Sequence, residues 1–155
     1  MTAPAEQTAL LEVDDLVVTF RSAAGLVHAV SSVSFEVHRG ETVAIVGESG
    51  SDKTVTMLSM PGLVPAATTS GSARLDGEDL LAAGPERLRA LRGKRVGVVF
   101  QDPMTSLNPV IPVGEQIREA IWVHDRDGAR ADHVARAVAL LQSVGVPDAA
   151  RRAEQ

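Results

Sequence analysis

Two short apolar runs constrain the fold of this chain more than any other feature. The first is Thr42–Val46, closed by Gly47, and the second is Val96–Phe100. Short runs that are mostly apolar and rich in β-branched residues are typical of strands buried on both faces of a sheet. Helix patterns lie between and after these runs, so the sequence predicts an α/β core.

An antiparallel β part is predicted around this core. The segments Leu10–Phe20 and Val27–Val37 alternate apolar and polar residues around the turn Arg21–Leu26, which indicates a hairpin. The second segment keeps its alternation only after a slip in its middle. Residues 65–71 are interpreted as a loop, and Ser72–Leu80 as a second hairpin with a tight turn at Asp76-Gly77.

Four helices are predicted, and each has a recognisable boundary. Lys53–Met60 is stopped by Pro61-Gly62, and a second helix begins at Gly84-Pro85-Glu86 and ends at Gly93. Val113–His124 and Ala129–Val144 follow a long loop. The last helix is predicted to bury the apolar face Val134, Val138, Leu141 and Val144.

Composition excludes several classes of protein. The 155 residues carry 15 Lys plus Arg against 20 Asp plus Glu, and a net charge of -5 argues against a basic nucleic-acid binder. The chain has no cysteine, which excludes disulfides, cysteine-based zinc sites and thiol nucleophiles. No apolar run approaches the about 18–20 residues that span a bilayer. We therefore expect a cytoplasmic protein, with residues 1–8 as a loose leader.

The segment between the first apolar run and the first helix has the pattern of a phosphate-binding loop. Its residues are Gly47, Glu48, Ser49, Gly50, Ser51, Asp52, Lys53 and Thr54. In such a loop the backbone N–H groups and the lysine ammonium hold phosphate oxygens, and the Thr hydroxyl holds Mg²⁺. The alternative is a glycine-rich strand-to-helix turn that binds no ligand.

One position departs from this pattern, because Asp52 stands where the motif requires glycine. Aspartate adds a Cβ and a negative charge beside a polyphosphate. A like-charge contact near 4 Å costs about 4 kcal/mol at an effective dielectric constant of 20, which is nearly a thousandfold in affinity. We therefore expect nucleotide binding to be weakened or lost.

A longer segment carries a family resemblance. Phe100-Gln101-Asp102-Pro103-Met104-Thr105-Ser106-Leu107-Asn108-Pro109, followed by Val113-Gly114-Glu115-Gln116-Ile117, resembles the Q-loop region of ATP-binding cassette (ABC) subunits. The resemblance is to importers of oligopeptides, dipeptides and nickel, and it covers the chain from about residue 10 to the end. It disfavours other phosphate-loop proteins such as kinases and GTPases.

The resemblance implies roles for particular residues. Phe20 matches the aromatic residue that stacks on adenine, although a core Phe that ends a strand is an equal alternative. Residues 47–54 match the phosphate loop for ATP, with Thr54 and Gln101 as contacts of Mg²⁺ and Gln101 also touching the attacking water. The four histidines match no functional position and are interpreted as solvated or locally bonded.

The resemblance also implies partners and an incomplete domain. Residues 9–155 correspond to the N-terminal part of an ABC nucleotide-binding domain: the β-subdomain, part of the phosphate-loop NTPase core and the start of the helical subdomain. The signature, the Asp-Glu strand and the switch His of the family have no counterpart here, so we expect the chain alone to be inactive as an ATPase. The implied partners are transmembrane permease subunits and a second ABC subunit, with the chain peripheral on the inner membrane face.

Two functions therefore remain open at this stage. One is the ATP-binding, energy-coupling component of a peptide-type importer. The other is a truncated, catalytically inactive remnant with weakened nucleotide binding. In the family, the strands that separate the two apolar runs come from the part with no counterpart here. We therefore predict that residues 43–46 and 96–100 lose their ladder partners and expose apolar edges.

Overall fold

The computed structural model describes residues 8–23, 25–101 and 106–155. The chain forms two compact units, Met1–Arg92 and Gly93–Gln155, which we call the first and second units and describe separately. The predicted leader lies outside the described residues except for Thr8, and so do Asp102 to Thr105 of the Q-loop segment.

The first unit is built on a four-stranded antiparallel sheet with the order β2-β1-β3-β4. The bounds of the strands are Leu11–Ser22 for β1, Gly25–Val37 for β2, Ala67–Leu75 for β3 and Glu78–Asp79 for β4. Both predicted hairpins are confirmed. The prediction of a loop over residues 65–71 is wrong from Ala67 onward, because this segment pairs with the end of β1, where Ala67 faces Phe20. The free edge of β1 is the hydrogen-bonding partner of β3, and local sequence alone could not identify it.

A crease crosses three neighbouring strands at one level of the sheet. Asp15 in β1, Ser32 in β2 and Gly71 in β3 have φ values of 47°, 55° and 90°. The Ser32 hydroxyl donates to Asp15 Oδ1 at 2.7 Å, and the Asp15 N–H donates to Ser34 Oγ at 2.9 Å. The strand registers shift here, which confirms the slip predicted in the middle of β2. The Ser34 hydroxyl thus satisfies the backbone N–H of Asp15 at the interruption of the ladder, and the Ser32–Asp15 bond links the side chains of β1 and β2.

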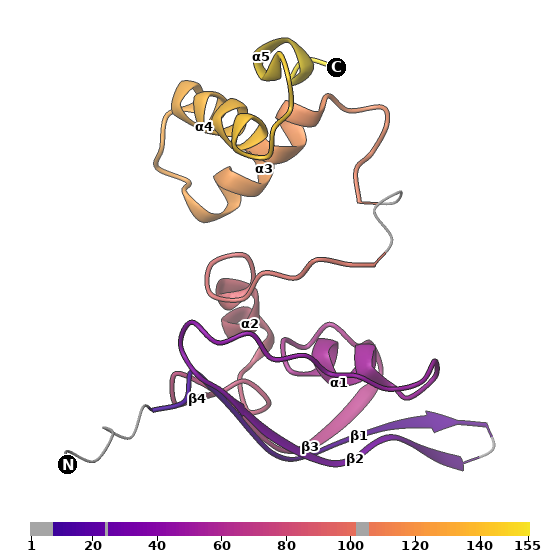
Figure 1. Ribbon diagram of the computed structural model, residues 1–155. Coiled ribbons are helices and arrows are strands. Elements are labelled where there is room, and N and C mark those ends of the chain that lie inside the picture. The colour runs from indigo at the N-terminus through magenta and orange to yellow at the C-terminus, as the bar shows by residue number, and fades with distance from the viewer. Residues whose placement is uncertain (1–7, 24, 102–105) are drawn as a thin grey trace. The chain divides into compact units, whose positions relative to one another are not determined.

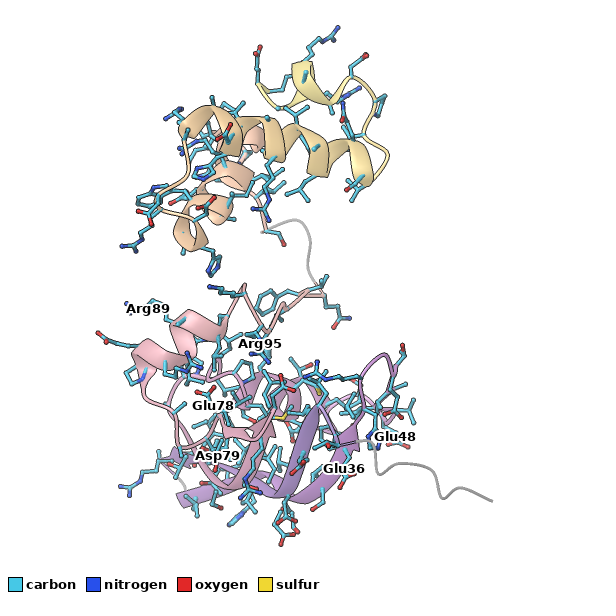
Figure 2. All side chains as sticks on the ribbon, turned by 90° about the vertical axis from the view of Figure 1, so that its left-hand side faces the viewer. Glu36, Glu48, Glu78, Asp79, Arg89 and Arg95 are labelled. Atoms are coloured by element: carbon cyan, nitrogen blue, oxygen red, sulfur yellow. The ribbon has the colours of Figure 1, made fainter. Side chains whose placement is uncertain are left out.

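The core of the first unit lies between the sheet and two short helices, α1 (Lys53–Ser59) and α2 (Pro85–Leu91). Figure 1 shows α1 against the sheet. Leu16 and Val18 are 0% exposed at its centre. Arg87 of α2 binds both carboxylate oxygens of Glu78, labelled in Figure 2, at 2.6 and 2.7 Å, which ties the helix to β4. The core is aliphatic, as a chain with 3% aromatic residues requires.

The two apolar runs do not form the predicted strands. Neither Thr42–Val46 nor Gly97–Phe100 has regular secondary structure, and Val46 and Val99 are 87% and 99% exposed. A strand needs a hydrogen-bonding partner, and in the described part of the chain no segment pairs with Thr42–Val46 or Gly97–Phe100. Only Val96, at the start of the second run, forms an isolated bridge with Arg92, and its carbonyl accepts from the Gly93 N–H at 2.8 Å. The prediction of buried strands is therefore wrong for this chain, whereas the predicted exposure of apolar residues is confirmed.

The second unit contains α3 (Val113–His124), α4 (Arg130–Ser143) and α5 (Ala149–Arg152). The first two confirm predicted helices, and α5 was not predicted. The predicted apolar face of α4 is confirmed at Leu141, which is buried, and in part at Val138, which is half-buried. It is wrong at Val134 and Val144, which are 42% and 75% exposed, and the other buried residues are His133 and Ala137. His133 Nε2 lies 3.1 Å from Asp125 Oδ2, so this histidine is locally bonded, as predicted.

A charged cluster joins α3 to α4 and makes one pH-dependent prediction. Glu115 accepts hydrogen bonds from Arg118 and Arg130, each at 2.8 Å, and chiefly the Arg118 contact lowers the pKa of Glu115 below its ordinary value of 4.5. A lowered folded-state pKa adds stability above the ordinary value, which is lost as the pH falls through the folded value. As the pH is lowered from neutral to acid, the temperature of thermal unfolding should therefore fall less for Glu115→Gln than for the natural chain. An equal fall in unfolding temperature for the two chains would contradict a stabilising role for the ion pairs of Glu115.

Candidate functional site

The loop Gly47–Thr54 is closed around the ammonium group of Lys53, the first residue of α1. Lys53 Nζ donates to the carbonyl oxygens of Gly47 at 2.8 Å and Glu48 at 2.6 Å, and to Ser51 Oγ at 2.9 Å. The Ser51 hydroxyl in turn donates to the Glu48 carbonyl at 2.9 Å. Figure 2 labels Glu48 at the surface of the first unit, and the whole segment 47–51 is exposed. The loop is therefore at the surface, but its contacts use all three N–H donors of the half-buried Lys53, so a ligand would have to replace them.

Glycine is needed at two positions of this loop for different reasons. A Cβ on Gly47 would lie 2.7 Å from Ser51 Oγ, so the Ser51 side chain would have to move away from its contact with Lys53. Gly50 has a φ of 85°, which glycine adopts far more readily than other residues. The glycines that the sequence pattern singled out thus permit the turn that surrounds Lys53.

Asp52 adopts the conformation that the motif reserves for glycine. Its φ and ψ are 52° and 24°, in the left-handed region, and it occupies the N-cap of α1 without a side-chain capping bond. Its carbonyl nevertheless accepts from the Thr56 N–H at 2.9 Å and the Thr56 hydroxyl at 3.0 Å. The turn into α1 therefore forms in spite of the aspartate.

The donor groups of this loop fit a phosphate ligand, with one exception. Lys53 supplies a cationic donor, and Thr54 supplies an exposed hydroxyl of the type that holds Mg²⁺ beside phosphates. Among the described residues, no cluster of three His, Cys, Asp or Glu side chains suited to a metal occurs. The exception is the Asp52 carboxylate, which opposes a polyphosphate.

The other predicted site residues lie apart from the loop in the chain. Phe20, near the end of β1, is half-buried and packs against the core of the first unit. Gln101 is exposed and belongs to the second unit. The contacts of the loop thus bring Gly47, Glu48, Ser51 and Lys53 together, whereas the roles of Phe20, Thr54 and Gln101 remain predictions.

Sequence reasoning missed a positioning role for Gln116 in α3. Its side-chain amide donates to the carbonyls of Asn108 at 2.9 Å and Ile111 at 2.7 Å, and its oxygen accepts from the Asn108 N–H at 2.8 Å. Gln116 therefore holds the second part of the predicted Q-loop segment against its own helix. The signal was present, since an amide side chain in the first turn can bind the loop before the helix.

Comparison with known proteins assigns the family. The model of the ABC transporter family matches residues 30–154. The chain belongs to this family. The predicted resemblance is confirmed, and the fold agrees with a partial ABC domain. A dimeric ATP-binding cassette described as post-hydrolysis and bound to ADP and Pi superposes with a TM-score of 0.79 at 21% identity, over 94% of this chain and 60% of that one.

Several members of the ABC family are closer in sequence. The oligopeptide transport ATP-binding protein of Bacillus subtilis (strain 168) is 42% identical over 96% of this chain and 42% of its own length. The protein of the same name from Mycobacterium tuberculosis (strain ATCC 25618 / H37Rv) is 49% identical over 92% and 24%. The dipeptide transport ATP-binding protein of Lactococcus lactis (subsp. cremoris, strain MG1363) is 43% identical over 90% and 41%. The chain thus spans less than half the length of these relatives.

Proposed function

We propose that this chain is an ATP-binding part of the energy-coupling subunit of a peptide importer. The observation that carries the proposal is the loop closed around Lys53 within a chain that belongs to the ABC transporter family. The proposed ligand is ATP with Mg²⁺, and the relatives from Bacillus subtilis and Lactococcus lactis are named as ATP-binding proteins. Lys53 would bind the phosphates and Thr54 the metal ion, while Phe20 offers a ring face for adenine.

The proposal includes the partners and the location. Permease subunits in the membrane and a second ABC subunit would complete the transporter, and the chain would act at the inner face of the membrane. Two observations support this assembly: relatives named for peptide transport, and a matching cassette structure that is dimeric. In the described part of the chain, no helix is long and apolar enough to cross a bilayer.

Isothermal titration with Mg-ATP tests the site when Asp52 is removed. We expect the full chain with Asp52→Gly to bind Mg-ATP, and Lys53→Ala in that background to lower affinity by about 10- to 100-fold, the value of a charge-assisted hydrogen bond. Lys94→Ala is the matched control, because Lys94 is the only other lysine, is exposed and lies in the second unit. Failure of the Asp52→Gly chain to bind Mg-ATP would contradict the proposal, as would equal effects of the two lysine substitutions.

A further inference from the structure

We propose that Asp52 is a specificity-determining residue that acts through its charge rather than its backbone, and that it disfavours ATP more strongly than ADP. The inference rests on the proposed nucleotide site. It concerns a position at which this chain departs from the phosphate-loop pattern.

The backbone at position 52 does not oppose a ligand. A glycine in this motif serves to reach the left-handed region, and Asp52 already occupies it at φ 52° and ψ 24°. Aspartate and asparagine adopt this region more readily than other residues with a side chain. The turn still delivers its hydrogen bonds, since the Asp52 carbonyl accepts from Thr56 at 2.9 Å. The turn into α1 therefore forms its hydrogen bonds with aspartate at this position.

The charge at position 52, in contrast, is left without compensation. Asp52 is half-buried at the N-cap of α1, and its carboxylate makes no capping bond to the helix. The neighbouring Lys53 directs its ammonium to Gly47, Glu48 and Ser51 instead. Over the residues that the structure describes, the Asp52 carboxylate has no ion pair or hydrogen bond. The Asp52 carboxylate thus has no partner within the described chain, directly before the lysine that the phosphate-loop pattern assigns to the phosphates.

Repulsion by this charge depends on the charge of the ligand. ATP carries one more negative charge than ADP, with or without one bound Mg²⁺, so a nearby carboxylate penalises ATP more. A lysine released from its contacts would attract both ligands, but it cannot remove the difference between them. The natural chain should therefore have a lower ratio of ATP to ADP affinity than a variant with a neutral residue at position 52.

Titration of Mg-ATP and Mg-ADP into four full-length chains separates charge from conformation. Asp52→Asn removes the charge but keeps the size and the tolerance of positive φ, Asp52→Gly removes both, and Asp52→Glu keeps the charge. We expect Asp52→Asn and Asp52→Gly to raise Mg-ATP affinity similarly, by about 10- to 1000-fold, and to raise Mg-ADP affinity less. Asp52→Glu should stay as weak as the natural chain. Circular dichroism of each variant checks that the fold is unchanged.

Several results would overturn the inference. If Asp52→Gly binds tightly while Asp52→Asn remains weak, the side chain acts by its bulk and not by its charge. If affinities for both nucleotides rise equally, Asp52 does not discriminate between them. If all four chains bind Mg-ATP equally, the inference fails but the proposed function stands. If none binds either nucleotide, the proposed function fails and the inference with it.

Discussion

The chain with Val46→Lys and Val99→Lys is expected to remain monomeric at concentrations at which the natural chain self-associates. Val46 and Val99 are 87% and 99% exposed and lie in Thr42–Val46 and Gly97–Phe100, which pair with no segment of the described chain. Unpaired extended apolar segments are sites of association between copies. Burial of each valine contributes about 1.5–3 kcal/mol, so the double substitution should weaken association by at least about 100-fold.

Sedimentation velocity over a wide range of concentration measures this effect, and the chain offers a matched control. Val144→Lys makes the same chemical change at a valine that is 75% exposed but lies after α4, outside both runs. The control should associate like the natural chain. A natural chain that is monomeric throughout, with a cooperative thermal transition above about 45 °C, would contradict the expectation.

The second large effect is expected at the crease of the sheet, where Gly71→Ala should strongly destabilise the first unit. A Cβ on Gly71 would lie 2.6 Å from the carbonyl oxygen of Asp14 and closer still to that of Asp15. These are backbone atoms of β1, so β1 and β3 must separate. Together with the strain of a φ of 90°, this should cost about 3 kcal/mol or more.

Chemical denaturation of the full chain measures the decrease in the free energy of unfolding, and Gly77→Ala is the control substitution. Gly77 has a φ of 80° in the β3–β4 turn, but a Cβ there would meet nothing within 4 Å. That substitution should cost only the conformational strain, about 1–2 kcal/mol. Equal losses for the two variants would show that the crease has room to adjust.

Local sequence signals predicted the elements that are stabilised locally. The Asp76-Gly77 turn has φ values of 49° and 80°, as a tight hairpin with these residues requires, and α2 begins at Pro85 as its pattern indicates. The apolar run at Val43–Val46 could not be assigned in this way. Its apolar pattern indicates only a preference for burial, while formation of a strand depends on partners that are distant in the sequence.

In the candidate site, too, local sequence was sufficient to predict some features, whereas others depend on contacts formed only in the folded chain. The spacing of Gly47, Lys53 and Thr54 was sufficient to predict a phosphate loop, because the motif is continuous in the sequence. The hydrogen bonds from Lys53 to the carbonyls of Gly47 and Glu48 could not be predicted, because they depend on how the backbone orients these carbonyl groups. The buried face of α4 was predicted only in part for a related reason: periodicity indicated Leu141, whereas burial of His133 beside Asp125 depends on a contact outside the helix.

The left-handed backbone at position 52 also bears on how such a chain can change over generations. Codons for aspartate and glycine can differ by a single base, and both residues fit a φ of 52°. A lineage could therefore gain or lose the negative charge in one mutational step, without passing through a protein that fails to fold. Selection for folding alone would leave this step open in both directions, so the ligand affinity of the loop can drift independently of its architecture.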